Sequence, residues 1–150
     1  MQSLYGGAVR DIFIRLAEPR DSAALARLIG QLEYTATAEE VTERLAIMAH
    51  EGAPVLVAEL DGAVIGCLST SIMRVLHRPA PVGRISMMVV EESLRSCGIG
   101  TSLVRAAEGL LAQRGCYMVE VTSHVRRTDA HRFYEKLGYE RTSVRLARAL

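Results

Sequence analysis

Residues 85–103 read ISMMVVEESLRSCGIGTSL, and this stretch decides the fold. Its first part, residues 85–90, is an apolar run with one serine, which is typical of a strand buried on both faces. A polar loop follows and ends in two glycines one residue apart, Gly98 and Gly100. Apolar residues then recur at helical spacing, which predicts a helix over residues 99–113. The stretch therefore predicts a strand, a glycine-bearing loop and a helix.

The junction between this strand and helix has the features of an anion site. The first amides of a helix have no partner inside it, and the helix dipole places partial positive charge there. The glycines let the backbone approach a ligand closely, and Arg95 adds a positive charge. A diphosphate is the anion that fits best; the alternative is an ordinary turn. The P-loop pattern is missing, and Leu103 stands where a dinucleotide fingerprint needs its third glycine.

The composition fits one ordinary globular domain. The chain has 150 residues, of which 49% are hydrophobic and 23% charged. A net charge of +1 argues against a nucleic-acid binder, and no apolar run reaches the ~18 residues of a membrane span. Three cysteines without metal-ligand spacing indicate a reduced, cytoplasmic protein without a metal site. We expect a loose leader at 1–10 and a single domain over 11–150.

The other segments complete a mixed α/β pattern. They predict strands at 12–16, 55–60, 64–73, 117–123 and 139–146, and helices after Asp21-Ser22, after the Thr37 capping box and over 128–137. Asp61-Gly62 is a hairpin signal. Only the strands that flank the helix at 99–113 should run parallel. We predict a single-domain, mostly antiparallel sheet of about six to seven strands with about four helices.

Two motifs resemble those of a known family. The pattern Arg-x-x-Gly-x-Gly, formed by Arg95, Gly98 and Gly100 after a strand, is similar to the acyl-coenzyme A signature of the GNAT-type N-acetyltransferase superfamily. Residues 130–139, AHRFYEKLGY, resemble the second motif of that superfamily. The resemblance covers about residues 11–145 and implies the acyl-CoA N-acyltransferase fold, with acetyl-CoA as co-substrate and no metal.

The resemblance also implies where the coenzyme binds. Its pyrophosphate should contact the amides at the helix start. Its pantetheine arm should pair with the edge of the central strand, where one amide can polarise the thioester carbonyl. The residues implied are Met88, Val89, Val90, Arg95, Ser96, Cys97, Gly98, Ile99, Gly100, Thr101 and Arg127. Arg127 stands where many members have an asparagine that bonds the arm, so that contact is in doubt.

Two residues are candidates for proton transfer. Tyr134 matches the motif tyrosine whose hydroxyl lies near the sulfur, which implies a general acid. Without the motif, it reads as a core aromatic. Glu120 is the one acidic residue in the strand at 117–123, and burial would raise its pKa as a base requires; strand alternation allows it equally to face solvent. Glu91 and Glu92 are expected to be solvated.

These observations predict an enzyme that moves an acetyl group from acetyl-CoA to a primary amine of a small molecule or amino acid, by direct attack. A non-catalytic acyl-CoA-binding or sensing domain and a protein N-acetyltransferase are the alternatives. The expected partner is a small-molecule amine, without nucleic acid or membrane, and the resemblance admits a homodimer. The motifs do not specify the acceptor.

Overall fold

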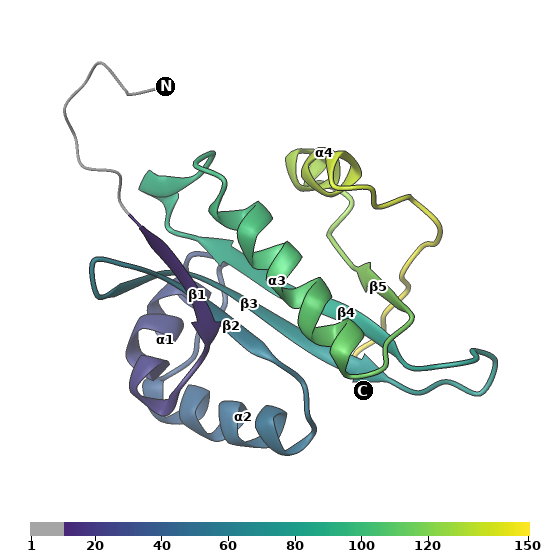
Figure 1. Cartoon of the computed structure of the whole chain (residues 1–150), viewed down its shortest axis with the longest axis horizontal. Helices are drawn as coiled ribbons and strands as arrows, with labels where there is room; N and C mark the ends of the chain where they lie inside the picture. The colour runs from purple at the N-terminus through teal and green to yellow at the C-terminus, as the bar shows by residue number, and fades with distance from the viewer. Residues whose placement is uncertain (1–10) are drawn as a thin grey trace.

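The computed structural model describes residues 11–150, so the leader expected at 1–10 lies outside the described residues. Strands and helices follow the predicted order up to the last helix (Figure 1). In chain order they are β1 (Ile12–Leu16), α1 (Ser22–Gly30), α2 (Ala38–His50), β2 (Val55–Leu60), β3 (Ala63–Met73), β4 (Val82–Val90), α3 (Ile99–Gln113), β5 (Met118–Val121) and α4 (Thr128–Lys136). Short 3-10 turns precede α1 at Pro19–Asp21 and α3 at Glu92–Leu94.

The described strands form one sheet in the order β1-β2-β3-β4-β5. Neighbouring strands are antiparallel except β4 and β5, which are parallel, as the crossover through α3 requires. The predicted fold class is confirmed, but the sheet has five strands and not six to seven.

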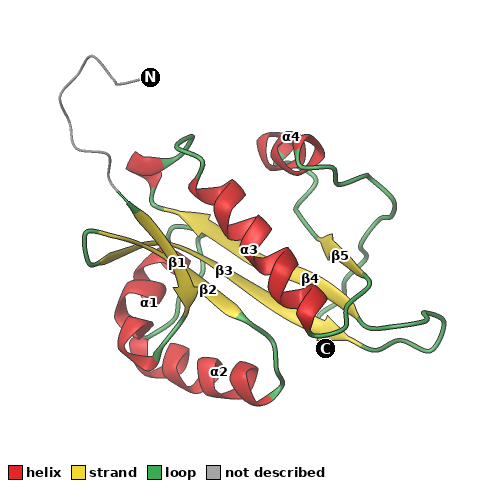
Figure 2. Cartoon of the chain, in the orientation of Figure 1, coloured by secondary structure: helices red, strands yellow, loops and turns green. Residues whose placement is uncertain are grey.

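The strand predicted at 139–146 is wrong, because that segment is a coil in the structure (Figure 2). The amide of Tyr139 bonds to the carbonyl of Tyr134, and within the described part of the chain no later backbone group makes a further backbone bond. Residues 140–150 are exposed throughout. A strand requires a neighbour to pair with, so local alternation alone does not form one.

Helices cover both faces of this sheet (Figure 1). On one face, α3 and α4 pack against strand residues that include Leu68 and Ile85. On the other, α1 and α2 pack around Val57 and Cys67. The buried positions of α3 recur at helical spacing: Ile99, Leu103, Val104, Ala107 and Leu111. The spacing in the sequence predicts this face except for Val104. The two faces therefore have separate cores, and β4 contributes to both.

Glycine lets α3 approach the sheet closely. A Cβ atom on Gly83 of β4 would lie 2.7 Å from Cδ1 of Leu111, a distance that real Cβ atoms essentially never show. The sequence signal for the hairpin is also confirmed, since Asp61 and Gly62 have φ values of 50° and 79°. Two positive φ values in a two-residue turn match the twist of antiparallel strands.

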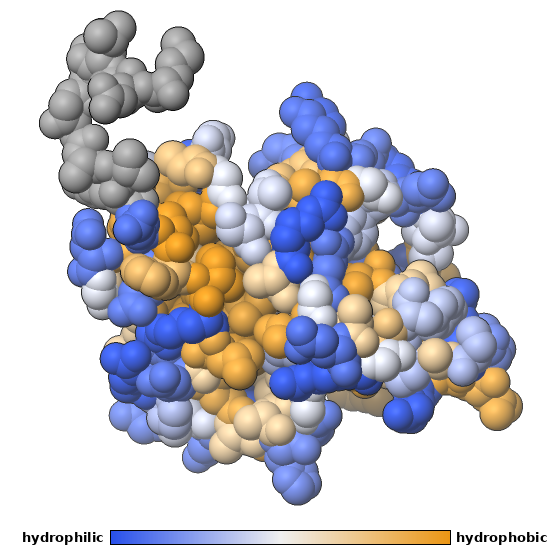
Figure 3. Space-filling model, viewed as in Figure 1, coloured by the Kyte–Doolittle hydropathy of each residue, from blue (hydrophilic) through white to orange (hydrophobic). Residues whose placement is uncertain are grey.

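The apolar surface is most evident over β1 and α3 (Figure 3). Ile12 and Ile14 of β1, with Ala106 and Leu110 of α3, pack against the core but are only partly buried. Within residues 11–150, no helix combines the length and the hydrophobicity needed to cross a bilayer.

Candidate active site

The carboxyl end of β4 leads directly into the glycine loop. After Val90, a 3-10 turn and residues 95–98 carry the chain to α3, and Gly98 is the residue before the first helical turn. Gly98 has a φ of 82°, and a Cβ built on it would meet nothing within 4 Å. The backbone therefore adopts a left-handed conformation that favours glycine, on an open surface.

The amides of this loop are unpaired. Among hydrogen bonds between described residues, none is donated by the amides of residues 96–101; the next amide, that of Ser102, bonds to the carbonyl of Gly98. Residues 95–98 are exposed, and Arg95 donates from Nε to the carbonyl of Val90 at 3.3 Å. Unpaired amides at the start of a 15-residue helix favour an anion.

Glu91 holds the beginning of this loop against α1. Its carboxylate accepts hydrogen bonds from Nη1 of Arg27 and from Nε2 of Gln31 at 3.0 Å, and its amide bonds to the carbonyl of Ile65 at 2.7 Å. These side-chain bonds hold the pKa of Glu91 below its usual value. Glu91 remains about a quarter exposed, and Glu92 is exposed as predicted; the sequence did not show that Glu91 is also paired with α1.

The second half of β4 has a free edge. β5 pairs with β4 only from Val82 to Ile85, so in the described part of the chain no strand pairs with residues 86–90 on that side. On the other side, Ser69 of β3 lies opposite Met87 and the next pair joins residues 70 and 85, which leaves Ser86 as a β-bulge. Bulges often redirect side chains beside active sites. An extended amide chain could add to this edge along the predicted residues Met88, Val89 and Val90.

Gly100 is the point where the two sequence motifs meet. A Cβ atom on it would lie 3.3 Å from Cζ of Phe133 in α4 and 3.5 Å from Cε of Met88 in β4. The structure therefore brings together the helix start, the free edge of β4 and the helix that carries Tyr134.

Tyr134 is buried between two aromatic rings. Its ring centroid lies 5.0 Å from that of Phe133 and 5.5 Å from that of Tyr139, both edge to face. Burial raises its pKa to about 12, and the charge of Arg127 opposes part of this rise. The hydroxyl of Tyr134 has no hydrogen-bond partner among the described residues. It is still reachable by solvent, because the one fully buried side-chain oxygen or nitrogen without a partner in residues 11–150 is Oε1 of Gln31. A protonated phenol with a free hydroxyl is a suitable proton donor.

Glu120 lies in β5 opposite Arg84 of β4. Its Oε1 accepts from Nε and Nη2 of Arg84 at 2.9 and 2.7 Å, and about a third of each side chain is exposed. The sequence analysis did not identify Arg84 as a site residue, although a charged residue inside an apolar strand was a signal that could have found it. Parallel pairing of the strands around α3 would have placed it beside Glu120.

The other predicted contacts lie around the helix starts. Cys97 is exposed, with Sγ 3.7 Å from the carbonyl of Arg95, and Ser96 has a φ of 67°. Thr101 is half-buried in the first turn of α3. Arg127 is the residue before α4, where its amide bonds to the carbonyl of His124.

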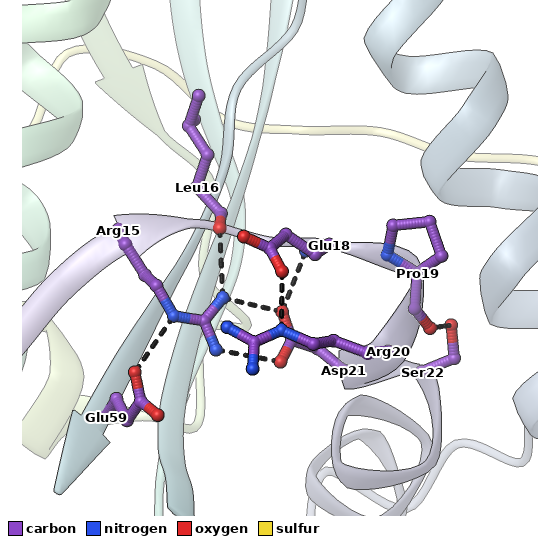
Figure 4. A network of polar contacts seen from close by, with 8 residues as sticks. All are labelled: Arg15, Leu16, Glu18, Pro19, Arg20, Asp21, Ser22 and Glu59. Carbon is purple, nitrogen blue, oxygen red and sulfur yellow. Dashed lines mark hydrogen bonds and ion pairs between the residues drawn. The ribbon is translucent and has the colours of Figure 1, made fainter. Parts of the chain in front are cut away.

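A second charged cluster lies where β1 leads into α1 (Figure 4). Arg15 bonds both oxygens of Asp21 at 2.8 and 2.9 Å and Oε2 of Glu59 at 3.0 Å. Asp21 also accepts from the amide of Glu18, and Arg15 lowers its pKa. Arg15, Asp21 and Glu59 line a pocket of about 310 Å³ together with Arg20 and others. The cluster fixes the start of α1 to the sheet.

Known proteins similar to this chain include acetyltransferases. The sequence profile of the acetyltransferase (GNAT) family matches residues 22–139. Aminoalkylphosphonate N-acetyltransferase of Salmonella typhimurium is 34% identical over 90 residues, which are 60% of this chain and 58% of that protein. Mycothiol acetyltransferase of Thermomonospora curvata is 29% identical over 140 residues, 89% of this chain and 46% of that protein. The chain thus spans about half the length of these relatives.

Solved structures show the same fold. An acetyltransferase of Trypanosoma brucei superimposes with a TM-score of 0.81 at 26% identity, over 93% of this chain and 100% of that chain. Glucosamine-6-phosphate N-acetyltransferase of Arabidopsis thaliana gives 0.82 at 25% identity, over 93% of this chain and 98% of that one.

Proposed function

This chain belongs to the acetyltransferase (GNAT) family, and we propose that it transfers an acetyl group from acetyl-CoA to a primary amine of a small molecule. The observation that carries the proposal is the free edge of β4 beside a loop of unpaired amides. The first suits an extended pantetheine arm and the second a diphosphate.

The residues present fit the coenzyme. The amides of Ser96 to Thr101 would bind its pyrophosphate on the open side of Gly98, where no Cβ stands in the way. Arg95 and Arg127 lie beside the two helix starts and would neutralise phosphate charge. Along β4, an amide among Met88, Val89 and Val90 would donate to the thioester carbonyl. This arrangement would place the thioester near the end of the β4–β5 pairing.

Tyr134 would then act as the proton donor and Glu120 as the proton acceptor. As the amine nitrogen bonds to the thioester carbon and the carbon–sulfur bond breaks, Tyr134 would donate its phenolic proton to the departing thiolate. The proton lost by the amine would pass to the carboxylate of Glu120, directly or through water. Exchange with water would return the first proton to Tyr134 and remove the second from Glu120. The net products are an N-acetyl amine and the free thiol of coenzyme A.

The relatives support an amine acceptor. One is named for aminoalkylphosphonates and the other for mycothiol, so both names specify small molecules.

The three cysteines are free thiols, which is consistent with a reducing, cytoplasmic setting.

The test is to mix the protein with acetyl-CoA and a panel of small amines, peptides and proteins, and to follow thiol release and acetylated product by mass spectrometry. We expect turnover on small amines. Calorimetric binding of acetyl-CoA without turnover on any acceptor would identify a sensing domain, and turnover confined to peptides or proteins would identify a protein acetyltransferase. Failure to bind acetyl-CoA would refute the proposal.

A further inference from the structure

The Arg84–Glu120 pair leaves one polar atom of each partner free. Nε and Nη2 of Arg84 both donate to Oε1 of Glu120. Nη1 of Arg84 and Oε2 of Glu120 have no partner among the described residues. The pair therefore presents a free donor with positive charge beside a free acceptor with negative charge, and solvent reaches both side chains.

The pair lies on the face of the sheet opposite Tyr134. Its strand neighbours Ile85 and Val121 belong to the same core as Tyr134. Because side chains alternate along a strand, Arg84 and Glu120 point to the other face. They also occupy the last part of the β4–β5 pairing before β4 becomes free. A thioester at that point would have its acid on one face and this pair on the other.

Small hydroxyl side chains lie beside the pair on the same face. Ser71 lies opposite Arg84 in the register of β3 and β4. Ser69, two residues earlier on the same face, has its Oγ 2.8 Å from Oγ of Ser86 at the bulge. Helix α2 lies away from β5 in this region (Figure 1). Three short hydroxyl side chains thus lie on the face that carries the pair, toward the free part of β4.

We propose that the acceptor is a small amine that also carries an anionic group, and that Arg84 binds the anion while Glu120 binds the ammonium. This inference rests on the proposed function and specifies the acceptor of the same site. An anion would bond the free Nη1 of Arg84, and the ammonium would bond the free Oε2 of Glu120. Once Glu120 takes one proton from the ammonium, the neutral nitrogen can attack, so one carboxylate binds the acceptor and accepts its proton.

The test compares anionic amines with matched amines that lack the anion. β-Alanine, 2-aminoethylphosphonate and taurine form the first series; ethanolamine and n-propylamine form the second. The wild-type kcat/KM should be higher for at least one anionic amine by about tenfold or more, the value of a hydrogen bond between charged groups. Arg84→Gln should remove this preference, so that kcat/KM for the anionic amine falls about tenfold or more relative to kcat/KM for ethanolamine; any effect of the change on Glu120 is shared by both acceptors and cancels in this ratio. Arg84→Lys should restore part of the preference.

Two controls separate this role from a structural one. Arg44→Gln breaks a different Arg–Glu pair, the exposed one with Glu40 at 3.0 Å on α2, and should leave both series unchanged. Calorimetry with coenzyme A present measures binding of the anionic amines without turnover, and that binding should depend on Arg84. Equal kcat/KM for both series would overturn the inference while the proposed function stands. If no amine is acetylated but the anionic amines bind in an Arg84-dependent way, the proposed function is overturned while the inference about the anion stands. If there is neither turnover nor Arg84-dependent binding, the proposed function and the inference are both overturned.

Discussion

The glycine at the start of α3 provides the sharpest test of the coenzyme site. Gly98 and Gly62 have nearly the same φ, 82° and 79°, and a Cβ on either would meet nothing within 4 Å. Gly62 lies in the β2–β3 hairpin, outside the proposed coenzyme site. Replacing each with alanine therefore applies the same backbone perturbation at two sites, only one of which should bind a ligand.

The two changes should cost similar stability and different affinity. An L-residue in the left-handed conformation costs about 1–2 kcal/mol, so the free energy of unfolding should fall by about that amount in both Gly98→Ala and Gly62→Ala. At position 98 the methyl group would also stand where phosphate oxygens must come within about 2.9 Å of the amides. We expect the Kd for acetyl-CoA to rise about tenfold or more, a loss of about 1.4 kcal/mol, in Gly98→Ala alone.

Urea unfolding with and without acetyl-CoA measures both effects. At a ligand concentration one hundred times the wild-type Kd, the ligand should stabilise the wild type and Gly62→Ala by about 2.7 kcal/mol. A tenfold weaker Kd reduces this gain to about 1.4 kcal/mol in Gly98→Ala. If the ligand stabilises both variants equally, the loop does not bind the coenzyme and the reasoning fails.

Three further changes test the acid, the packing and the charged cluster. Tyr134→Phe should lower kcat about hundredfold, with an unchanged calorimetric Kd for acetyl-CoA. The pKa of Tyr134 is raised to about 12, so its deprotonation should not lower the kcat of the wild type up to about pH 10. A decline of kcat below about pH 10 in the wild type that the variant lacks would contradict the acid role. Gly83→Ala should cost about 1–3 kcal/mol in urea unfolding through its clash with Leu111, and an unchanged midpoint would refute that packing. Asp21→Asn should cost about 1–3 kcal/mol at pH 7, because it removes the charge that accepts from Arg15 while Glu59 remains paired with Arg15. Arg15 lowers the pKa of Asp21 from 3.8, so the stability that the ion pair contributes is complete above that value and is lost as pH falls through the pKa of the folded state. The difference in unfolding free energy between the wild type and Asp21→Asn should therefore shrink in acid, and a constant difference would argue against the ion pair.

Several features were readable in the sequence because they depend on near neighbours along the chain. The helical spacing of Leu103, Ala107 and Leu111 predicted the buried face of α3. The Asp61-Gly62 pair predicted its hairpin because two positive φ values suit those residues. The strand, loop and helix around Gly98 were predicted with the bounds that α3 shows, because glycine, polarity and periodicity all change within a few residues there.

The sequence alone determined the order of elements up to α4 and the loop that would receive a diphosphate, because both are encoded by local pattern. Only the tertiary structure decided where β5 stops pairing with β4, that Glu91 is held by Arg27, and that Arg84 lies beside Glu120. It also decided that residues 140–150 form no strand. These features depend on contacts between residues far apart in the chain, and the spacing of side chains within one segment does not specify its neighbour.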